Sequence, residues 1–312
     1  MINVTRYKDE NESLWDRFVT ESKNGIFLFY RNYMEYHSDR FIDHSLLFFD
    51  RNRLIALLPA NSKGSTLLSH GGLTLGGFIF SEKMKTPLML KLFNALIEYL
   101  RDQKFKKLIY KPIPHIYHSV PAEEDLYALF LNNAKIYRRD VSSTIFQEKR
   151  PTYSKGRIWS VRKAKKGALE VSRSFDFKTF MGIEEENLLK KYGVKPTHTS
   201  EEIEMLAQRF PENIKLFTVI KEDTMLGGVI IYESQYVAHT QYIAATDQGK
   251  EIGALDVILD YLINEHYAKK KYFDFGISTE DDGKFLNTSL IQNKESYGAR
   301  ATVYDFYQID LK

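Results

Sequence analysis

The clearest hydrophobic pattern in the chain predicts a strand–helix–strand unit. An alternating run is followed by a polar turn, apolar residues at helical spacing and a second short apolar run. The predicted parts are a strand at residues 237–244, a turn at 246–251, a helix from 252 to 271 and a strand at 272–276. Such a crossover leaves the helix N-terminus open at one edge of the sheet. Together with Gly249 and Gly253, that open end suits a phosphate group.

The order of elements around this unit is repeated in the first half of the chain. A predicted hairpin at residues 46–58 is followed by a helix at 87–101 and a strand at 107–110. The segments 96–100 and 258–262 also match in residue character. Coincidence between two amphipathic helices is the plain alternative, but agreement in element order favours a duplication.

Charged, proline and glycine residues gather at 148–156 and indicate a domain boundary. We therefore expect an α/β fold with mixed sheets, divided into tandem domains at residues 1–150 and 151–312. The glycine-rich stretch at 71–77 stands where the first domain's own phosphate turn would lie, with only His70 as a nearby basic residue. We expect this first copy to be degenerate and to help enclose an acceptor.

Composition narrows the classes of function. The 312 residues are 43% hydrophobic, which supports a packed core, and a formal net charge of +3 gives no reason to expect DNA binding. There is no cysteine, which excludes disulfides and thiolate chemistry, and we expect no metal site. The charged N-terminus and the lack of an apolar run of about 18 to 20 residues predict a cytoplasmic protein without an integral membrane span.

Three motifs occur in order in the second half: a basic segment from Arg157 to Gly167, the run Phe273-Asp274-Phe275-Gly276, and the run Asn293-Lys294-Glu295-Ser296-Tyr297-Gly298. In this order they resemble the FemAB-like branch of the GNAT (Gcn5-related N-acetyltransferase) superfamily, the tandem-GNAT aminoacyl and acyl transferases of cell-envelope synthesis. The resemblance implies an acyltransferase that uses acyl-CoA as a co-substrate, with no permanently bound cofactor. It also implies an amine acceptor on a sugar, a sugar nucleotide or a peptidoglycan-type precursor.

The resemblance is incomplete at the pyrophosphate loop. GNAT enzymes carry Arg or Gln, two residues, Gly, one residue and a small residue, whereas here Lys250 leads to Gly253 and then to the bulky Leu255. On this alignment we expect the acyl-CoA pyrophosphate to contact four residues: Gln248, Gly249, Lys250 and Gly253.

Two other functions stay open. Members of the branch that use aminoacyl-tRNA need no coenzyme A pocket, although they often carry an inserted helical arm that this sequence lacks. The chain would then be a peptidyltransferase acting on a peptidoglycan precursor. Alternatively, the fold is retained as a non-catalytic module that binds a nucleotide sugar or a protein, which the imperfect loop supports.

The basic segment is a candidate site for a phosphorylated acceptor. We expect Arg157, Arg162 and Lys163 to contact phosphate, and Trp159 to stack on a base or sugar. The alternative is a solvated, charged surface.

His239 and Gln241 share one face of the strand at 237–244 if alternation is regular. Imidazole titrates near neutral pH, so His239 is a candidate base for the attacking amine, with Gln241 contacting substrate. By the family resemblance, Tyr297 would protonate the leaving thiolate. The alternative for His239 and Gln241 is a hydrogen-bonded, half-buried polar pair beneath the helix.

Asp274, Ser278 and Lys294 complete the predicted substrate contacts. Asp274 and Ser278 stand at the end of a predicted strand, and ligands gather at the carboxyl edges of open α/β sheets. The alternative is that the aspartate and the serine are there because such residues initiate turns. The acyl donor, the acceptor and the oligomeric state are left open.

Overall fold

The computed structural model describes residues 2–311 and divides the chain into two compact units. Unit 1 comprises Met1–Asp140, Glu280–Phe285 and Val303–Lys312, and unit 2 comprises Val141–Thr279 and Leu286–Thr302. The division therefore falls near residue 140, not at the position after residue 150 that the sequence indicated, and the chain returns to unit 1 at its end. The cause is that two long strands, β9 and β17, each contribute residues to both units.

Unit 1 contains two groups of strands. The first follows the order β1-β3-β4-β7, with strands Ile2–Arg6, Leu46–Asp50, Arg53–Leu58 and Ile79–Phe80. The second follows the order β17-β8-β6-β5-β2, with strands Arg300–Asp310, Lys107–Tyr110, Thr66–Leu68, Asn61–Lys63 and Ile42–Asp43. The helices are α1 (Glu12–Glu21), α2 (Arg31–Met34), α3 (Thr86–Asp102) and α4 (Glu124–Leu131).

Helix α3 supplies much of the core of unit 1. Its apolar stripe is buried against β-strand residues such as Phe48 and Leu108, and burial of this kind contributes about 25 cal/mol per Å². The helix predicted at 87–101 and the hairpin at 46–58 are confirmed. Arg51 and Asn52 both take positive φ values, which suits the tight turn between β3 and β4.

Unit 2 is built on a mixed sheet with the strand order β10-β11-β12-β13-β14-β9. The strands are Val171–Ser174, Ile214–Lys221, Thr224–Glu233, Val237–Ala245, Tyr272–Ile277 and Lys135–Phe146. The helices are α5 (Lys155–Lys165), α6 (Phe177–Tyr192), α7 (Ser200–Arg209), α8 (Asp247–Ile252), α9 (Ala254–Tyr261) and α10 (Thr288–Glu295). Two short strands, β15 (Thr279–Glu280) and β16 (Phe285–Leu286), pair with each other.

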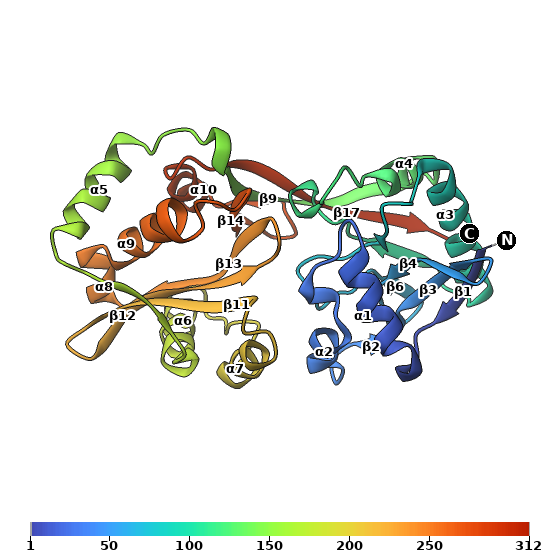
Figure 1. The fold of residues 1–312 in the computed structure, drawn as a ribbon, viewed down its shortest axis with the longest axis horizontal. Helices are drawn as coiled ribbons and strands as arrows, with labels where there is room; N and C mark the ends of the chain where they lie inside the picture. Colours follow the sequence, from blue (N-terminus) through green and yellow to red (C-terminus); the bar gives the residue numbers. More distant parts are fainter. Residues whose placement is uncertain (1, 312) are drawn as a thin grey trace. The chain divides into compact units, whose positions relative to one another are not determined.

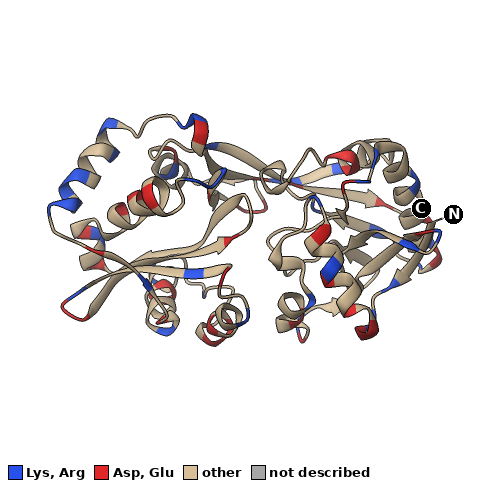
Figure 2. Ribbon diagram, in the orientation of Figure 1, with Lys and Arg blue, Asp and Glu red and all other residues tan. Residues whose placement is uncertain are grey.

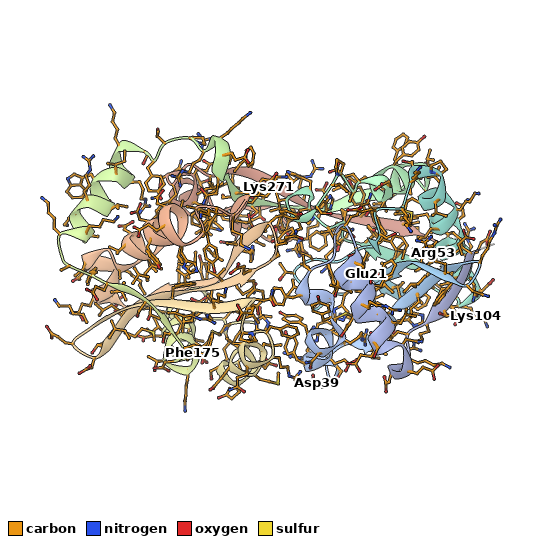
Figure 3. The ribbon with its side chains drawn as sticks, in the orientation of Figure 1. Glu21, Asp39, Arg53, Lys104, Phe175 and Lys271 are labelled. Carbon is orange, nitrogen blue, oxygen red and sulfur yellow. The ribbon has the colours of Figure 1, made fainter. Side chains whose placement is uncertain are left out.

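Helices cover both faces of the unit 2 sheet (Figure 1). Helix α9 packs on β11, β12 and β13 from one side, and α6 packs on β12 and β13 from the other. The buried side chains of α9 form a core with strand residues such as Val229, Ile231 and Phe273. Phe175, labelled in Figure 3, follows β10 and remains 72% exposed on the α6 side.

The predicted strand–helix–strand unit is confirmed, and β13 and β14 pair in parallel. The predicted turn and helix start are wrong in detail. Residues 247–252 form α8, whose first turn is capped by the Thr246 side chain, and Gly253 then takes φ +80°. A left-handed residue ends α8 before α9 begins, so the predicted turn is itself helical, and the predicted helix corresponds to α9 and a π-helical turn that ends at His266.

A β-bulge changes which side chains share a face of β13. The pairing with β12 shifts between Ile230 and Ile231, so Gln241 has no partner in the register. His239 therefore lies on the same face as Tyr242, because both align with β12 residues two positions apart. Regular alternation would put His239 and Tyr242 on opposite faces, so the bulge changes the set of side chains on the His239 face. No helix within residues 2–311 combines the length and apolar character needed to cross a bilayer.

Candidate functional site

A histidine and an aspartate lie side by side at the parallel strand pair of unit 2. His239 on β13 is in register with Asp274 on β14, and Nδ1 of His239 is 2.7 Å from Oδ2 of Asp274. The parallel pairing explains this geometry, because residues in register on neighbouring strands point to the same face. Two of the predicted site residues are therefore brought into direct contact.

Asp274 is fully buried and its second oxygen is also bonded. Oδ1 accepts hydrogen bonds from Ser142 Oγ at 2.6 Å and Thr144 Oγ1 at 2.7 Å, both on β9. Burial acts to raise the pKa of Asp274, but the bonds from His239, Ser142 and Thr144 prevail and hold it below its usual value. Asp274 is therefore a carboxylate at neutral pH, held in one orientation.

This arrangement prepares His239 for proton transfer. A carboxylate that accepts the Nδ1 proton fixes the imidazole tautomer and leaves the Nε2 lone pair as the acceptor. The negative charge beside the ring also stabilises the imidazolium that forms after proton uptake. The His239 side chain is 10% exposed, so water has little access to the pair. The pair can act as a general base for an acyl-transfer step.

Lys294 of α10 reaches the same strand end. Its Nζ donates to the carbonyl oxygens of Gly276 at 3.0 Å and Ile277 at 2.7 Å. Burial lowers the pKa of Lys294 to about 8, although the Asp274 carboxylate opposes that shift. Gly276 has φ +72°, and a Cβ there would lie 3.3 Å from the His239 ring, so glycine lets the ring and the strand end approach closely.

Ser278 also lies at this strand end. It is 2% exposed, and its backbone N–H donates to the Val141 carbonyl at 2.8 Å. Its Oγ is buried without a hydrogen-bond partner in the part of the chain that the structure describes. Ser278 and Lys294 therefore lie at the end of β14, whereas Asp274 lies within the strand and not at its end, and substrate contact by all three stays a prediction.

Tyr297 and Arg157 lie in a packed cluster instead. The Tyr297 hydroxyl donates to Asp256 Oδ1 at 2.9 Å, and the Arg157 guanidinium lies 4.1 Å from the centre of the Tyr297 ring. Arg157 also forms an ion pair with Asp256 and donates to Ser296. Tyr297 is 1% exposed, and burial raises its pKa well above the usual value. These contacts pack both residues into the cluster, and the protonated Tyr297 hydroxyl donates its hydrogen bond to Asp256.

The rest of the basic segment lies on α5, whose ribbon carries several blue, basic positions in Figure 2. Trp159 is 65% exposed, and the Lys163 ammonium lies 5.4 Å from the centre of its ring. Arg162 lines a cavity of about 410 Å³ with residues of the preceding loop, α5, α9 and the π-helical turn, among them Arg150, Tyr153, Lys165, Asp260 and Asn264.

The predicted pyrophosphate loop is occupied by contacts within the protein. Lys250 Nζ donates to Asn187 Oδ1 at 2.8 Å and to Asp247 Oδ1 at 3.0 Å. A Cβ on Gly249 would meet the Leu226 carbonyl, and one on Gly253 would meet Ala164, so both glycines serve close packing. Gln248 is exposed. An acyl-CoA donor remains a prediction, and this loop does not offer its pyrophosphate a free cation or an open cradle.

Sequence reasoning missed Ser142, Thr144 and Glu184. The first two share one face of β9 with Asp140, and this row of polar residues at every second position was the available signal. Glu184 is buried on α6, where it occupies the position of the buried stripe Phe177, Phe180 and Met181 at helical spacing. An acidic residue on an apolar stripe was the signal that could have found it.

Comparison with protein-family models gives no match, and comparison with curated proteins gives none. Solved structures do match. FemX has a TM-score of 0.70 at 12% identity, over 99% of this chain and 97% of that one. L-PGS from Bacillus licheniformis has a TM-score of 0.63 at 11% identity, over 97% and 92%. A tandem GNAT protein from the clavulanic acid biosynthesis pathway has a TM-score of 0.52 at 10% identity, over 100% and 99%. The chain therefore has the FemAB-like tandem GNAT fold that these solved structures share.

Proposed function

We propose that this protein is an acyltransferase that moves an activated acyl group onto an amine, with His239 as the general base. The observation that carries the proposal is the 2.7 Å contact between His239 and Asp274, with Asp274 held by two hydroxyl groups of β9. The fold shared with FemX and L-PGS supports the class of reaction, and the buried pair supplies the chemistry that the class needs.

The reaction is a direct attack within a ternary complex. The amine nitrogen forms a bond to the acyl carbonyl carbon and loses one proton to Nε2 of His239. The bond from that carbon to the leaving oxygen or sulfur breaks, and the leaving group takes a proton as the imidazolium returns to neutral. Asp274 stabilises the transient imidazolium, because its carboxylate remains ionised and in contact with Nδ1.

For the acceptor, we propose an amine on a sugar, a sugar nucleotide or a peptidoglycan-type precursor. The cavity beside α5 supports a phosphorylated acceptor, because Arg162 lines it together with Arg150 and Lys165. Lys165 is partly neutralised by Asp260 at 2.6 Å, so the two arginines supply most of the positive charge. Exposed Trp159 on the same helix offers a surface for stacking on a base or sugar.

For the donor, the occupied loop at α8 favours an aminoacyl ester over acyl-CoA. Lys250 would have to leave Asp247 and Asn187 to meet a pyrophosphate, and Asp247 is an ionised carboxylate at that helix start. Lys190 and Lys250 lower the pKa of Asp247 to about 2 through hydrogen bonds and charge. An aminoacyl-tRNA donor needs no such loop, so the peptidyltransferase alternative is favoured, with acyl-CoA as the second candidate.

The test is a transfer assay with two donors. Purified protein receives either tRNA charged with radiolabelled amino acids or radiolabelled acetyl-CoA, and UDP-linked peptidoglycan precursors and amino sugars serve as acceptors. We expect transfer from charged tRNA that His239→Ala reduces by about 10² to 10⁴-fold. His266→Ala, an exposed histidine of the same unit, is the matched control and should keep the wild-type rate. Transfer from neither donor would favour the non-catalytic module.

A further inference from the structure

Helix α5 carries a row of basic and aromatic side chains on the face that points away from α9. The row repeats at intervals of four, four and three residues, so its members share one face of the helix. It extends over about 16 Å, because an α-helix rises about 1.5 Å per residue. We call this row the outer strip, and it consists of Lys155, Trp159, Lys163 and Lys166, all of them exposed.

Contacts on the opposite face of α5 fix the direction of the outer strip. Val161 and Ala164 are buried on that face, and Arg157 forms an ion pair with Asp256 of α9. Helix α5 packs on α9 and lies at the outer edge of unit 2 (Figure 1). Because the helix cannot turn without breaking these contacts, the strip faces solvent as a fixed, convex surface, from which Trp159 projects with 65% of its area exposed.

Positive charge is concentrated in the segment that carries the strip. Eight of the 44 Lys and Arg residues of the chain lie between positions 149 and 169, and none of its 41 Asp and Glu residues does. The remaining chain therefore has 36 basic and 41 acidic residues, a formal net charge of −5. An anionic surface attracts this segment and repels the rest of the chain, so it orients the molecule with α5 toward it.

The charges of the outer strip are available to such a surface. Lys165, on the side of the cavity, pairs with Asp260 at 2.6 Å, whereas no lysine of the strip pairs with a carboxylate in the part of the chain that the structure describes. The Lys163 ammonium lies 5.4 Å from the centre of the Trp159 ring, so one charge stands beside the exposed indole. Neither of these two residues lines the cavity beside α5.

The shape of the strip favours a lipid surface over a nucleic acid. Proteins that bind single strands track the backbone along a groove and stack several aromatic rings on successive bases. The outer strip is instead the convex face of one helix, with one aromatic ring between lysines. Tryptophan suits the headgroup region of a bilayer, and lysine side chains can lie along apolar surface while their ammonium groups reach lipid phosphates.

We propose that the outer strip docks this protein on a membrane surface rich in anionic phospholipid headgroups. The contact is peripheral, because the face of a single surface helix makes it. With one tryptophan and three lysines, binding is reversible and weakens as salt screens the charges. The inference goes beyond the proposed acyl transfer, since docking requires neither a substrate nor His239, and the two can fail separately.

The test is vesicle binding followed by tryptophan fluorescence. The vesicles contain either equal parts of phosphatidylglycerol and phosphatidylcholine or phosphatidylcholine alone. The chain has two tryptophans, and Trp15 is fully buried in unit 1, so a change on addition of vesicles reports Trp159. We expect a blue shift and quenching by brominated lipid with the mixed vesicles, both lost at high salt, and neither effect with phosphatidylcholine alone. Trp159→Phe should abolish the fluorescence response.

Two triple variants with the same change in net charge localise the contact. The first, on the strip, is Lys155→Gln, Lys163→Gln and Lys166→Gln. The second, the matched control at exposed positions outside α5, is Lys178→Gln, Lys191→Gln and Lys221→Gln. We expect the strip variant to bind mixed vesicles about 10²-fold more weakly, at about fivefold per lysine, and the control to bind as wild type.

Three results overturn the proposal. The first is that the wild type does not bind the mixed vesicles, and the second is that both triple variants lose affinity equally. The third is that the strip binds a single-stranded RNA oligonucleotide but not the mixed vesicles, which would make it a nucleic-acid site. Circular dichroism of each variant checks that the fold is retained, so that a loss of binding reports the strip itself.

Discussion

His239 and Asp274 lie in register on neighbouring parallel strands, and the contact between Nδ1 and Oδ2 measures 2.7 Å. The carboxylate is held in place from β9, so the orientation of the imidazole is set by three strands of one sheet. A proton acceptor built in this way needs no movement of the backbone to become competent, because the tautomer and the ring plane are already fixed.

The first prediction concerns Asp274→Asn. The amide keeps the shape of the carboxyl but removes its charge, so the imidazolium loses its stabilising partner and the tautomer is no longer fixed. We expect the rate of transfer to fall by about 10²-fold or more, with the fold retained by circular dichroism. Asp247→Asn, at an exposed position, is the control and should change the rate little. A wild-type rate in Asp274→Asn would remove the aspartate from the mechanism.

The second prediction concerns the stability of Glu184→Gln. Burial raises the pKa of Glu184 from 4.5 to about 7, so the folded state holds this proton more tightly than the unfolded state. The wild type should therefore lose stability as the pH rises from about 4.5 to 7, by up to about 3 kcal/mol. Glutamine carries no charge at any pH, so the variant should be more stable than the wild type at pH 8.

Urea unfolding of both proteins at pH 4.5 and pH 8 measures this difference. The groups near Glu184 that also titrate or carry charge are His198, Tyr242 and Glu202, and all three are present in both proteins. Glu186→Gln should show the pH dependence of the wild type. A variant that is less stable than the wild type at pH 8 would mean that the carboxylate has a partner in the folded protein.

The third prediction concerns Tyr297→Phe. The family resemblance suggested that Tyr297 protonates the leaving group. In the structure, the Tyr297 hydroxyl instead donates its hydrogen bond to Asp256 in a buried cluster. We expect a loss of about 1 kcal/mol in unfolding free energy, from one hydrogen bond, and little change in turnover. Thermal unfolding and steady-state rates measure the two effects. A large fall in turnover with unchanged stability would restore the catalytic role.

The fourth prediction compares two charge reversals on α5. Arg162 lines the cavity beside α9, whereas Lys163 lies over the Trp159 ring. Arg162→Glu should raise KM for a phosphorylated acceptor by about tenfold or more, because it replaces an attractive charge by a repulsive one. Lys163→Glu changes net charge equally and should have a smaller effect. Equal effects of the two reversals would point to general electrostatics, not to a cavity site.

Much of the unit 2 fold follows from sequence pattern alone. The alternation of residues 237–244 and the apolar stripe from Ile252 onward predict a strand and a helix, and the structure has both. Two local features were beyond that reasoning. Gly253 takes a left-handed conformation that separates α8 from α9, and the bulge at Gln241 changes the faces of β13. Both depend on tertiary contacts, with Ala164 and with the neighbouring strand β12.

The candidate site was predicted only in part, because it too depends on contacts between residues that are distant in the sequence. His239 and Asp274 were both chosen, but their contact depends on the parallel register of β13 and β14, which no local pattern gives. Arg157 was chosen because it belongs to a basic run, yet its ion pair with Asp256 comes from packing of α5 against α9. Charge in the sequence does not distinguish a buried ion pair from a ligand contact.

The central claim is that His239 removes the proton of the attacking amine. The most direct measurement is the single-turnover rate of His239→Ala, with and without added imidazole. The account predicts a loss of about 10² to 10⁴-fold and a partial recovery when imidazole fills the space left by the side chain. A variant that transfers the acyl group at the wild-type rate without imidazole would contradict it.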